Sequence, residues 1–294
     1  MNHGNSLRIK KSTLLWLLVP SIAIYTFVMI IPLILSFYYS LTDWTGGPTK
    51  AFIGFDNYRF LMKDSLFWES FHNNLIILLF TIVFQMSLAF ILTSLFMSKA
   101  MRLKEFHRTV IFFPVVLSAV VVGFIWQMMY SQDYGIVNTV LKSVGLDSYI
   151  MPWLDDPKVV IYAVTLPLIW QFLGIPMIIF MSAVQGISKD IYETCELDGC
   201  TGIKKAIYIT FPLIYDTIKV VIMLSISSNM LVFSHIYVLT GGGPGTSSMV
   251  LAQYAYKTSF TSMQLGYGSA VTIGMFILSF GLVLVFKWLA EVKK

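Results

Sequence analysis

The chain alternates between long apolar runs and short polar segments. A transmembrane helix needs about 20 mainly apolar residues, and six runs reach that length. They cover about Leu14–Phe37, Leu75–Met97, Thr109–Tyr130, Val159–Val184, Ile218–Leu239 and Gly268–Leu289. The first run is too long for a cleavable signal peptide and is followed by no small-residue cleavage site. The pattern predicts an all-α integral membrane protein with six transmembrane helices, in one domain over residues 1–294.

The polar segment Ile187–Pro212 separates the fourth and fifth apolar runs and carries its own helix signals. Ser188 suits an N-cap position, and Asp190 suits the positive end of a helix dipole. Gly199 is a natural end for that helix, with a positive φ that a side chain would oppose. Apolar residues then recur at helical spacing up to Pro212. We therefore expect a helix, a turn and a second helix, with a plain solvated loop as the competing interpretation.

Composition supports the membrane assignment. The chain of 294 residues is 57% hydrophobic and only 12% charged, whereas soluble domains carry roughly a quarter charged residues. Mean hydropathy is +0.77. Both cysteines, Cys195 and Cys200, lie in the polar segment. Their position predicts reduced cytosolic thiols, with neither a disulfide framework nor a metal site.

The distribution of charge predicts the orientation. With both termini in the cytoplasm, 14 basic and 7 acidic residues lie inside, against 6 basic and 8 acidic residues outside. The amino-terminal cluster Arg8, Lys10 and Lys11 belongs to the inner set. This asymmetry follows the positive-inside rule. The net charge of +5 is therefore a signal of topology, and it does not indicate binding of nucleic acid.

Polar residues inside the apolar runs are costly unless they face the bundle or water. The fifth run holds Ser225, Ser227, Ser228, Asn229, Ser234 and His235. Serine can bond its own backbone, whereas the Asn229 amide offers two donors and an acceptor that match a sugar hydroxyl. We interpret His235 as a hydrogen-bonded core residue. In the fourth run, Gly174 and Pro176 weaken the helix, which fits simple packing and a substrate path equally well.

The glycine-rich string Tyr237–Ser248 precedes the last apolar run. It is not a phosphate-binding loop, because no Lys-Ser/Thr pair follows at the required spacing. The charge distribution also places it outside. Two more outer strings, Tyr134–Leu146 and Met151–Pro157, lie between the third and fourth runs.

Several of these strings resemble those of sugar-type binding-protein-dependent ABC importer permeases, the maltose, lactose and glycerol-phosphate group. Glu193, then Leu197–Gly199, then Phe211–Leu213 resembles the "EAA" signature of that family. Thr194 and Cys195 stand where the family usually has two alanines. The string Tyr237–Ser248 resembles the Thr-Gly-Gly-Pro string of the same permeases, and the two outer strings before it continue the resemblance.

The resemblance implies the ABC importer permease fold of the maltose-transporter type, with residues 187–212 as the cytoplasmic coupling segment. The residues that it assigns to ATPase coupling are Glu193, Thr194, Cys195, Leu197, Asp198 and Gly199. The residues that it assigns to the substrate path are Asn229, Ser225, Trp170, Leu173, Gly174 and Met177.

The resemblance also implies a function. The chain would be a non-catalytic permease subunit of an ATP-driven carbohydrate importer in a bacterial or archaeal plasma membrane. A second, similar permease would complete the pore within the lipid, and a solute-binding protein outside would deliver the sugar. A cytoplasmic ABC ATPase dimer would bind ATP and Mg, so this chain would need no cofactor or metal of its own.

The alternative from another class is a secondary sugar transporter driven by an ion gradient. Such a carrier would usually place an ionisable residue at mid-membrane, and His235 is the candidate well inside a run. A membrane enzyme would need an intramembrane nucleophile with a base, or a metal cluster. The sequence shows neither, and it does not identify the sugar.

Overall fold

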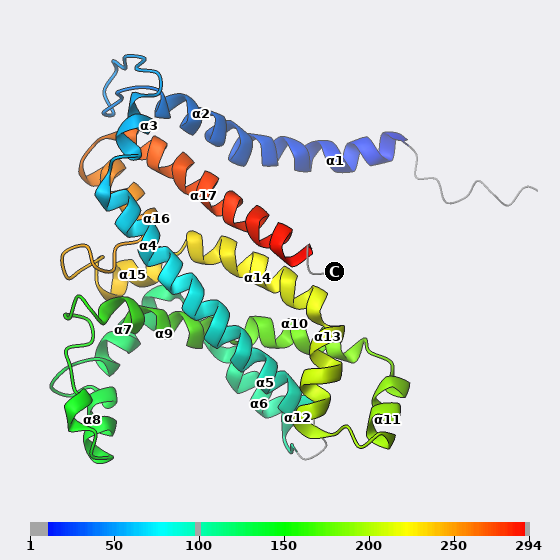
Figure 1. The fold of residues 1–294 in the computed structure, drawn as a ribbon. Helices are drawn as coiled ribbons and strands as arrows, with labels where there is room; N and C mark the ends of the chain where they lie inside the picture. Colours follow the sequence, from blue (N-terminus) through cyan, green and yellow to red (C-terminus); the bar gives the residue numbers. More distant parts are fainter. Residues whose placement is uncertain (1–10, 98–100, 292–294) are drawn as a thin grey trace, which may run out of the picture. The chain divides into compact units, whose positions relative to one another are not determined.

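The computed structural model describes residues 11–97 and 101–291, and almost all of its ordered elements are helices (Figure 1). The prediction of an all-α membrane protein is confirmed. Arg8 and Lys10 lie outside the described residues, and only the backbone of Lys11 is described. In the described part of the chain, β pairing is limited to a single bridge between Thr42 and Phe52.

Three apolar helices are long enough to cross a membrane in one piece. They are residues 15–40, built from α1 (Lys11–Tyr25) and α2 (Ile31–Ser40); residues 65–97, built from α4 (Ser65–Phe80) and α5 (Met86–Met97); and α17 (Leu265–Glu291). The second of these begins at Ser65 and not near Leu75. Asp64 caps it, because its Oδ1 accepts hydrogen bonds from the backbone N–H groups of Leu66 at 3.0 Å and Phe67 at 3.4 Å.

Three further spans are bent pairs of helices. In the third span, residues 104–116, which include α6 (Lys104–Phe112), meet α7 (Ala119–Met129) at a bend of 102°. In the fourth, α9 (Val160–Phe172) meets α10 (Gly174–Gln185) at a bend of 44°. In the fifth, residues 202–213, which include α12 (Gly202–Lys205) and α13 (Phe211–Leu213), meet α14 (Tyr215–Met230) at a bend of 73°. With each pair counted as one crossing, the described residues contain the six predicted spans.

The third predicted span, Thr109–Tyr130, is not one continuous helix in the structure. Pro114 ends α6 in a 3-10 turn, and the backbone at Leu117 and Ser118 is extended. The hydroxyl of Ser118 then accepts a hydrogen bond from the N–H of Val121 at 3.3 Å and starts α7. A proline followed by a capping serine thus turns the chain inside an apolar run.

The fifth span also differs from its predicted range, Ile218–Leu239. Helix α14 ends at Met230, and a separate short helix, α15 (Ser234–Leu239), follows after a break. Pro212 does not close the polar segment either, because the helix continues to Leu213 and bends at Ile214. A proline in the first turn of a helix is tolerated, since its missing N–H would have had no partner there.

The chain divides into two compact units. Unit 1 comprises Met1–Lys63 and Ala255–Gly274, and unit 2 comprises Asp64–Tyr254 and Met275–Lys294. The single domain expected over residues 1–294 stays a prediction.

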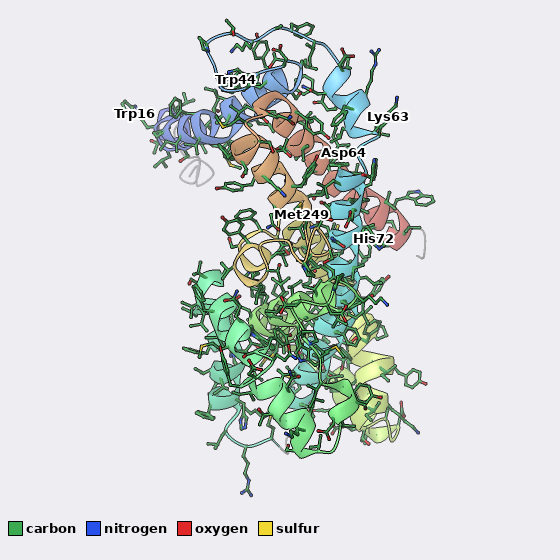
Figure 2. All side chains as sticks on the ribbon, turned by 90° about the vertical axis from the view of Figure 1, so that its left-hand side faces the viewer. Trp16, Trp44, Lys63, Asp64, His72 and Met249 are labelled. Atoms are coloured by element: carbon green, nitrogen blue, oxygen red, sulfur yellow. The ribbon has the colours of Figure 1, made fainter. Side chains whose placement is uncertain are left out.

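Unit 1 holds the first span, a loop, the short helix α3 (Asp56–Leu61) and the start of α17. Asn57 ties the loop down, because its Nδ2 donates to the carbonyls of Ser40 at 2.8 Å and Thr42 at 2.9 Å. The first span presents its apolar side chains outward, and Trp16 is 82% exposed (Figure 2). Apolar exposure of this kind fits a helix in lipid or against another membrane subunit.

Unit 2 contains two apolar clusters. One gathers α7, α9 and α15 around Val122, Val164 and Ile236. The other gathers α5, α10 and α14 around Met177 and Phe180. These clusters fix the bent spans on which the candidate sites lie.

Candidate functional site

The coupling segment forms the predicted helix and turn. Helix α11 (Lys189–Leu197) begins at Ser188, whose hydroxyl accepts a hydrogen bond from the N–H of Asp190 at 3.3 Å. It ends at Gly199, which has φ +74°. The N–H of Gly199 donates to the carbonyl of Glu196 at 3.1 Å, and that of Cys200 to the carbonyl of Cys195 at 2.8 Å. This pair of hydrogen bonds is a Schellman motif. The motif requires a residue in the left-handed conformation, which Gly199 supplies.

Side chains brace α11 against the helix that follows it. Lys205 forms an ion pair with Glu196, with 3.0 Å between Nζ and Oε1. The same ammonium lies 5.3 Å from the centre of the Tyr192 ring, and the Tyr192 hydroxyl is 3.4 Å from the hydroxyl of Thr210. Because Thr210 belongs to the helix that leads into α14, α11 is connected to the fifth span by side chains as well as by the backbone.

The six residues assigned to coupling separate into two groups. Glu193, Thr194, Leu197, Asp198 and Gly199 are exposed, with Leu197 at 89%. Cys195 is buried, and its thiol donates to the carbonyl of Cys200 at 2.9 Å. Burial, followed by this hydrogen bond, raises the pKa of the Cys195 thiol to about 11. Cys195 therefore packs inward, while the other five residues form an accessible face.

The two residues on α14 that the resemblance assigns to a substrate path form a closed polar network. Asn229 Nδ2 donates to the Ser225 carbonyl at 2.9 Å and to the Ser225 hydroxyl at 3.1 Å. The hydroxyl of Thr81 donates to Asn229 Oδ1 at 3.3 Å. Thr81 opens a π-helical turn, Thr81–Gln85, and such turns often occur at functional sites. The Asn229 amide thus has protein partners in this conformation, and its role toward a sugar stays a prediction.

The path residues on the fourth span lie along its bend. Met177 is fully buried in the cluster around Phe180, while Trp170 is 37% exposed. At Gly174 a Cβ atom would lie 2.9 Å from the Cα of Phe112, so the two backbones approach closely only because the residue is glycine. Leu173 is half-buried between Phe172 and the bend. Close helix packing accounts for Gly174 and Met177, and Trp170 remains accessible.

Sequence reasoning missed the role of Gln171. Its Nε2 donates to the carbonyl of Leu117 at 2.8 Å, and its Oε1 pairs with His235 Nε2 at 2.5 Å. Gln171 is 2% exposed. One buried amide thus joins the break in the third span, the bend in the fourth and the start of α15. His235 is a hydrogen-bonded core residue, as predicted.

The glycine-rich loop bonds to itself and to α4. Ser248 Oγ donates to the carbonyl of Gly243 at 2.7 Å and lies 2.8 Å from the hydroxyl of Thr240. The hydroxyl of Thr246 donates to Glu69 Oε1 at 2.9 Å. Gly241, Gly242 and Gly245 have positive φ values that a side chain would oppose. Hydrogen bonds within the loop and to α4 therefore fix the shape of the glycine-rich loop.

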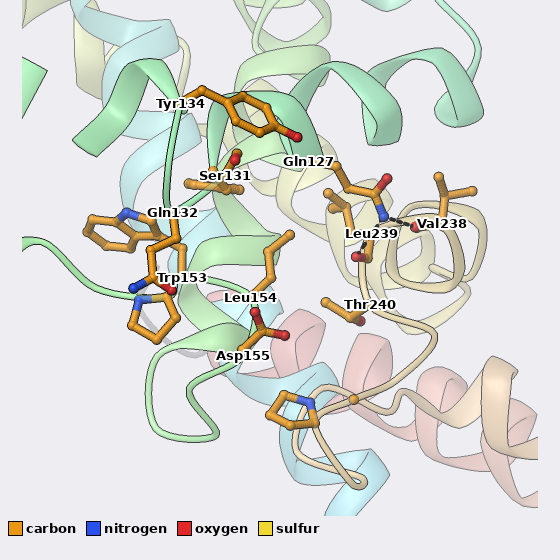
Figure 3. A pocket seen from close by; sticks show the side chains of 14 residues that line it. Gln127, Ser131, Gln132, Tyr134, Trp153, Leu154, Asp155, Val238, Leu239 and Thr240 are labelled. Carbon is orange, nitrogen blue, oxygen red and sulfur yellow. Dashed lines mark hydrogen bonds between the residues drawn. The ribbon is translucent and has the colours of Figure 1, made fainter. Parts of the chain in front are cut away.

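A pocket of about 580 Å³ lies beside this loop (Figure 3). Its walls come from the end of α7, the segment around Trp153, and residues 238–244. Sequence reasoning singled out the three outer strings that supply most of these walls but did not foresee that they meet. The sequence signal that could have indicated this meeting is that all three strings resemble the same permease family.

The family model described as "Binding-protein-dependent transport system inner membrane component" matches residues 85–292. The chain is 33% identical over 267 residues to the "Probable ABC transporter permease protein YurN" of Bacillus subtilis, covering 90% of this chain and 91% of that protein. It is 30% identical over 266 residues to the lactose transport system permease protein LacF of Rhizobium radiobacter, covering 89% and 88%.

A similar fold occurs in the crystal structure of a bacterial ABC transporter involved in the import of the acidic polysaccharide alginate. The TM-score is 0.82 with 22% sequence identity, and the superposition covers 95% of each chain.

Proposed function

Because this chain belongs to the family of binding-protein-dependent transport system inner membrane components, we propose that it forms half of the pore of an ATP-driven carbohydrate importer. The resemblance to sugar-type ABC importer permeases is confirmed at the level of the family.

The observation that carries the proposal is the exposed face of the coupling segment. Leu197 is 89% exposed and Ile203 is 78% exposed, although both are large apolar residues between two spans. Exposed apolar side chains rimmed by charged residues are typical of a protein interaction site. Charge asymmetry predicts that this face lies in the cytoplasm, where we propose that a separate ABC ATPase dimer binds ATP and Mg. This subunit is then non-catalytic, and α11 receives the motion of the ATPase.

The bracing of α11 supports transmission of that motion to the pore. The ion pair between Lys205 and Glu196 and the contact of Tyr192 with Thr210 connect α11 to the helix before α14. Helix α14 carries Ser225 and Asn229, the expected substrate contacts. A shift of α11 therefore reaches the substrate path through one bent pair of helices, as in rigid-body switching between two packed states.

Two further subunits complete the proposed importer. A second, similar permease covers the exposed apolar helices of this chain and closes the pore. A solute-binding protein delivers the sugar to the outer loops. The lactose permease among the relatives makes a carbohydrate the proposed substrate class.

The bonding of His235 favours this proposal over a secondary transporter. His235 is 5% exposed and its Nε2 pairs with the neutral amide of Gln171. A proton-coupled carrier would need an ionisable group that reaches water from either side in turn. His235 has a structural partner instead.

Reconstitution tests the proposal. The chain, its partner permease, the ATPase and the binding protein are placed in proteoliposomes, and uptake of labelled neutral mono- and disaccharides is measured. We expect uptake to require ATP on the side of the membrane that carries the ATPase. It should also require the binding protein on the opposite side. Uptake by this chain alone under an imposed proton or sodium gradient, without ATP, would establish the secondary transporter instead.

A further inference from the structure

The pocket beside the glycine-rich loop is separate from the expected substrate path. None of its 14 lining residues is one of the path residues on α9, α10 or α14. Its volume of about 580 Å³ falls within the range of small-molecule sites, about 300–1,000 Å³. The charge distribution of the chain places it on the outer side. It thus has the size and the position to hold a solute before that solute enters the membrane.

Two aromatic rings line the pocket in fixed positions. Tyr130 and Trp153 have ring centroids 6.0 Å apart, with 33° between the ring planes. The polar group of each side chain already has a hydrogen-bond partner. The Tyr130 hydroxyl donates to the Ala163 carbonyl at 2.8 Å, and Trp153 Nε1 donates to Asn138 Oδ1 at 2.8 Å. Tyr130 is buried in the apolar cluster around Val122, so half-buried Trp153 supplies the accessible ring surface of the pocket. Such surface suits the apolar C–H face of a sugar ring.

Polar groups around the rings supply hydrogen bonds. Gln127 is held in place because its Nε2 donates to the carbonyls of Val238 at 2.7 Å and Leu239 at 3.1 Å, which leaves its Oε1 as an acceptor. Gln132 is exposed at the rim and offers both a donor and an acceptor. Hydroxyl groups both donate and accept, so a sugar can use each of these atoms.

The charge of the lining selects among sugars. Asp155 is the charged residue of the lining, and its carboxylate points toward the wall that Thr240 forms (Figure 3). The lining contains neither Lys nor Arg. A carboxylate accepts hydrogen bonds from hydroxyls but repels an anion. The pocket therefore favours an uncharged ligand over a sugar acid or a sugar phosphate.

From this combination we propose that the pocket is an outer subsite for a neutral saccharide, distinct from the path through the spans. The proposal rests on the proposed function of the chain as a carbohydrate permease. The glycine-rich loop acts as the fixed rim of this subsite, with Thr240 and Pro244 as its contacts to the ligand.

Protection of an engineered cysteine tests the subsite in the full complex. Cys195 and Cys200 are replaced by alanine, Gln132→Cys is introduced, and the complex is placed in proteoliposomes with the outer face exposed. The rate of reaction with a membrane-impermeant maleimide is measured without binding protein, in rising concentrations of glucose, maltose, lactose and glucuronate. We expect at least one neutral sugar to slow the reaction, and glucuronate to have no effect at the same concentration.

Three variants test whether the protection comes from a sugar bound in the pocket. Trp153→Ala should raise the concentration for half-protection at least about tenfold, because a buried aromatic contact is lost. Tyr149→Ala removes an exposed outer aromatic that is not in the lining and should leave the value unchanged. Asp155→Lys changes an exposed side chain and should let glucuronate protect. In each variant, insertion and basal ATP hydrolysis report folding.

Uptake measured on the same vesicles separates the two proposals. If a neutral sugar is transported but none protects the cysteine, the subsite is refuted and the permease function stands. Protection that is unchanged in both Trp153→Ala and Asp155→Lys, or that glucuronate alone produces, also refutes it. If no sugar is transported under any condition, the proposed function fails and the subsite fails with it.

Discussion

Replacement of Gly199 by valine is the sharpest test of the coupling assignment. Gly199 has φ +74°, and a Cβ atom added there would meet nothing within 4 Å. The substitution therefore causes no clash, and its cost is that of holding a β-branched residue in the left-handed region. That cost is about 1–2 kcal/mol. The substitution destabilises the helix end at which the Cys200 N–H donates to the Cys195 carbonyl in the Schellman motif.

The chain contains a matched control for this substitution. Gly145 ends α8 (Ile136–Ser143) with φ +76° and with nothing within 4 Å of an added Cβ. Its N–H donates to the Lys142 carbonyl at 3.2 Å, and the N–H of Leu146 donates to the Leu141 carbonyl at 2.9 Å. Gly145→Val thus breaks the same motif at the same local cost. It does so between α7 and α9, in a loop that the charge distribution predicts to lie outside, and not in the proposed coupling segment.

The assay compares both variants with the parent after reconstitution with the ATPase, the partner permease and the binding protein. A shift of about 1–2 kcal/mol lowers the population of the native helix end roughly 5- to 30-fold relative to altered ends. Gly199→Val should therefore insert normally but lose most of its substrate-stimulated ATP hydrolysis. Gly145→Val should retain it.

Two results would refute this reasoning. If Gly199→Val binds the ATPase and stimulates hydrolysis as the parent does, the segment is a solvated loop. If both variants lose stimulation equally, the loss follows from strain at either helix end, and a specific role of Gly199 in coupling is refuted.

Three further outcomes are expected. Asn229→Leu should lower uptake or change sugar preference by the equivalent of about 0.5–1.5 kcal/mol, measured as kinetics over several sugars; unchanged kinetics would leave Asn229 with its structural bonds alone. At neutral pH a maleimide should modify Cys200 in the folded protein and Cys195 only after unfolding, because burial raises the pKa of the Cys195 thiol to about 11. Its reactivity should rise as the pH approaches that value, and peptide mass mapping that finds equal modification at neutral pH would contradict this. Without the native cysteines, a membrane-impermeant reagent applied to intact cells should label Tyr149→Cys but not Glu105→Cys, and the reverse pattern would invert the orientation.

Local features of the sequence were sufficient for much of this architecture. The lengths of the apolar runs predicted the helices, because a membrane leaves the backbone no other way to satisfy its hydrogen bonds within one segment. Ser188 and Gly199 predicted both ends of α11, since a cap and a left-handed glycine act within a few residues. The family followed from strings that are contiguous in the chain, such as Tyr237–Ser248.

Features that depend on distant segments came only from the tertiary structure. The break after Met230 lies within an apolar run, where hydropathy has no signal for a bend. Gln171 has no distinguishing signal in the sequence, and only folding places it within reach of the Leu117 carbonyl and His235.

The inward burial of Cys195 and the pocket beside Trp153 have the same cause. A helix pattern states which residues share a face, but not which other segment covers that face. Three outer strings, each unremarkable in hydropathy, become one cavity because α7, α9 and α15 pack around Val122, Val164 and Ile236. That packing is decided by shape and volume summed over the whole unit, and no local stretch of sequence encodes it.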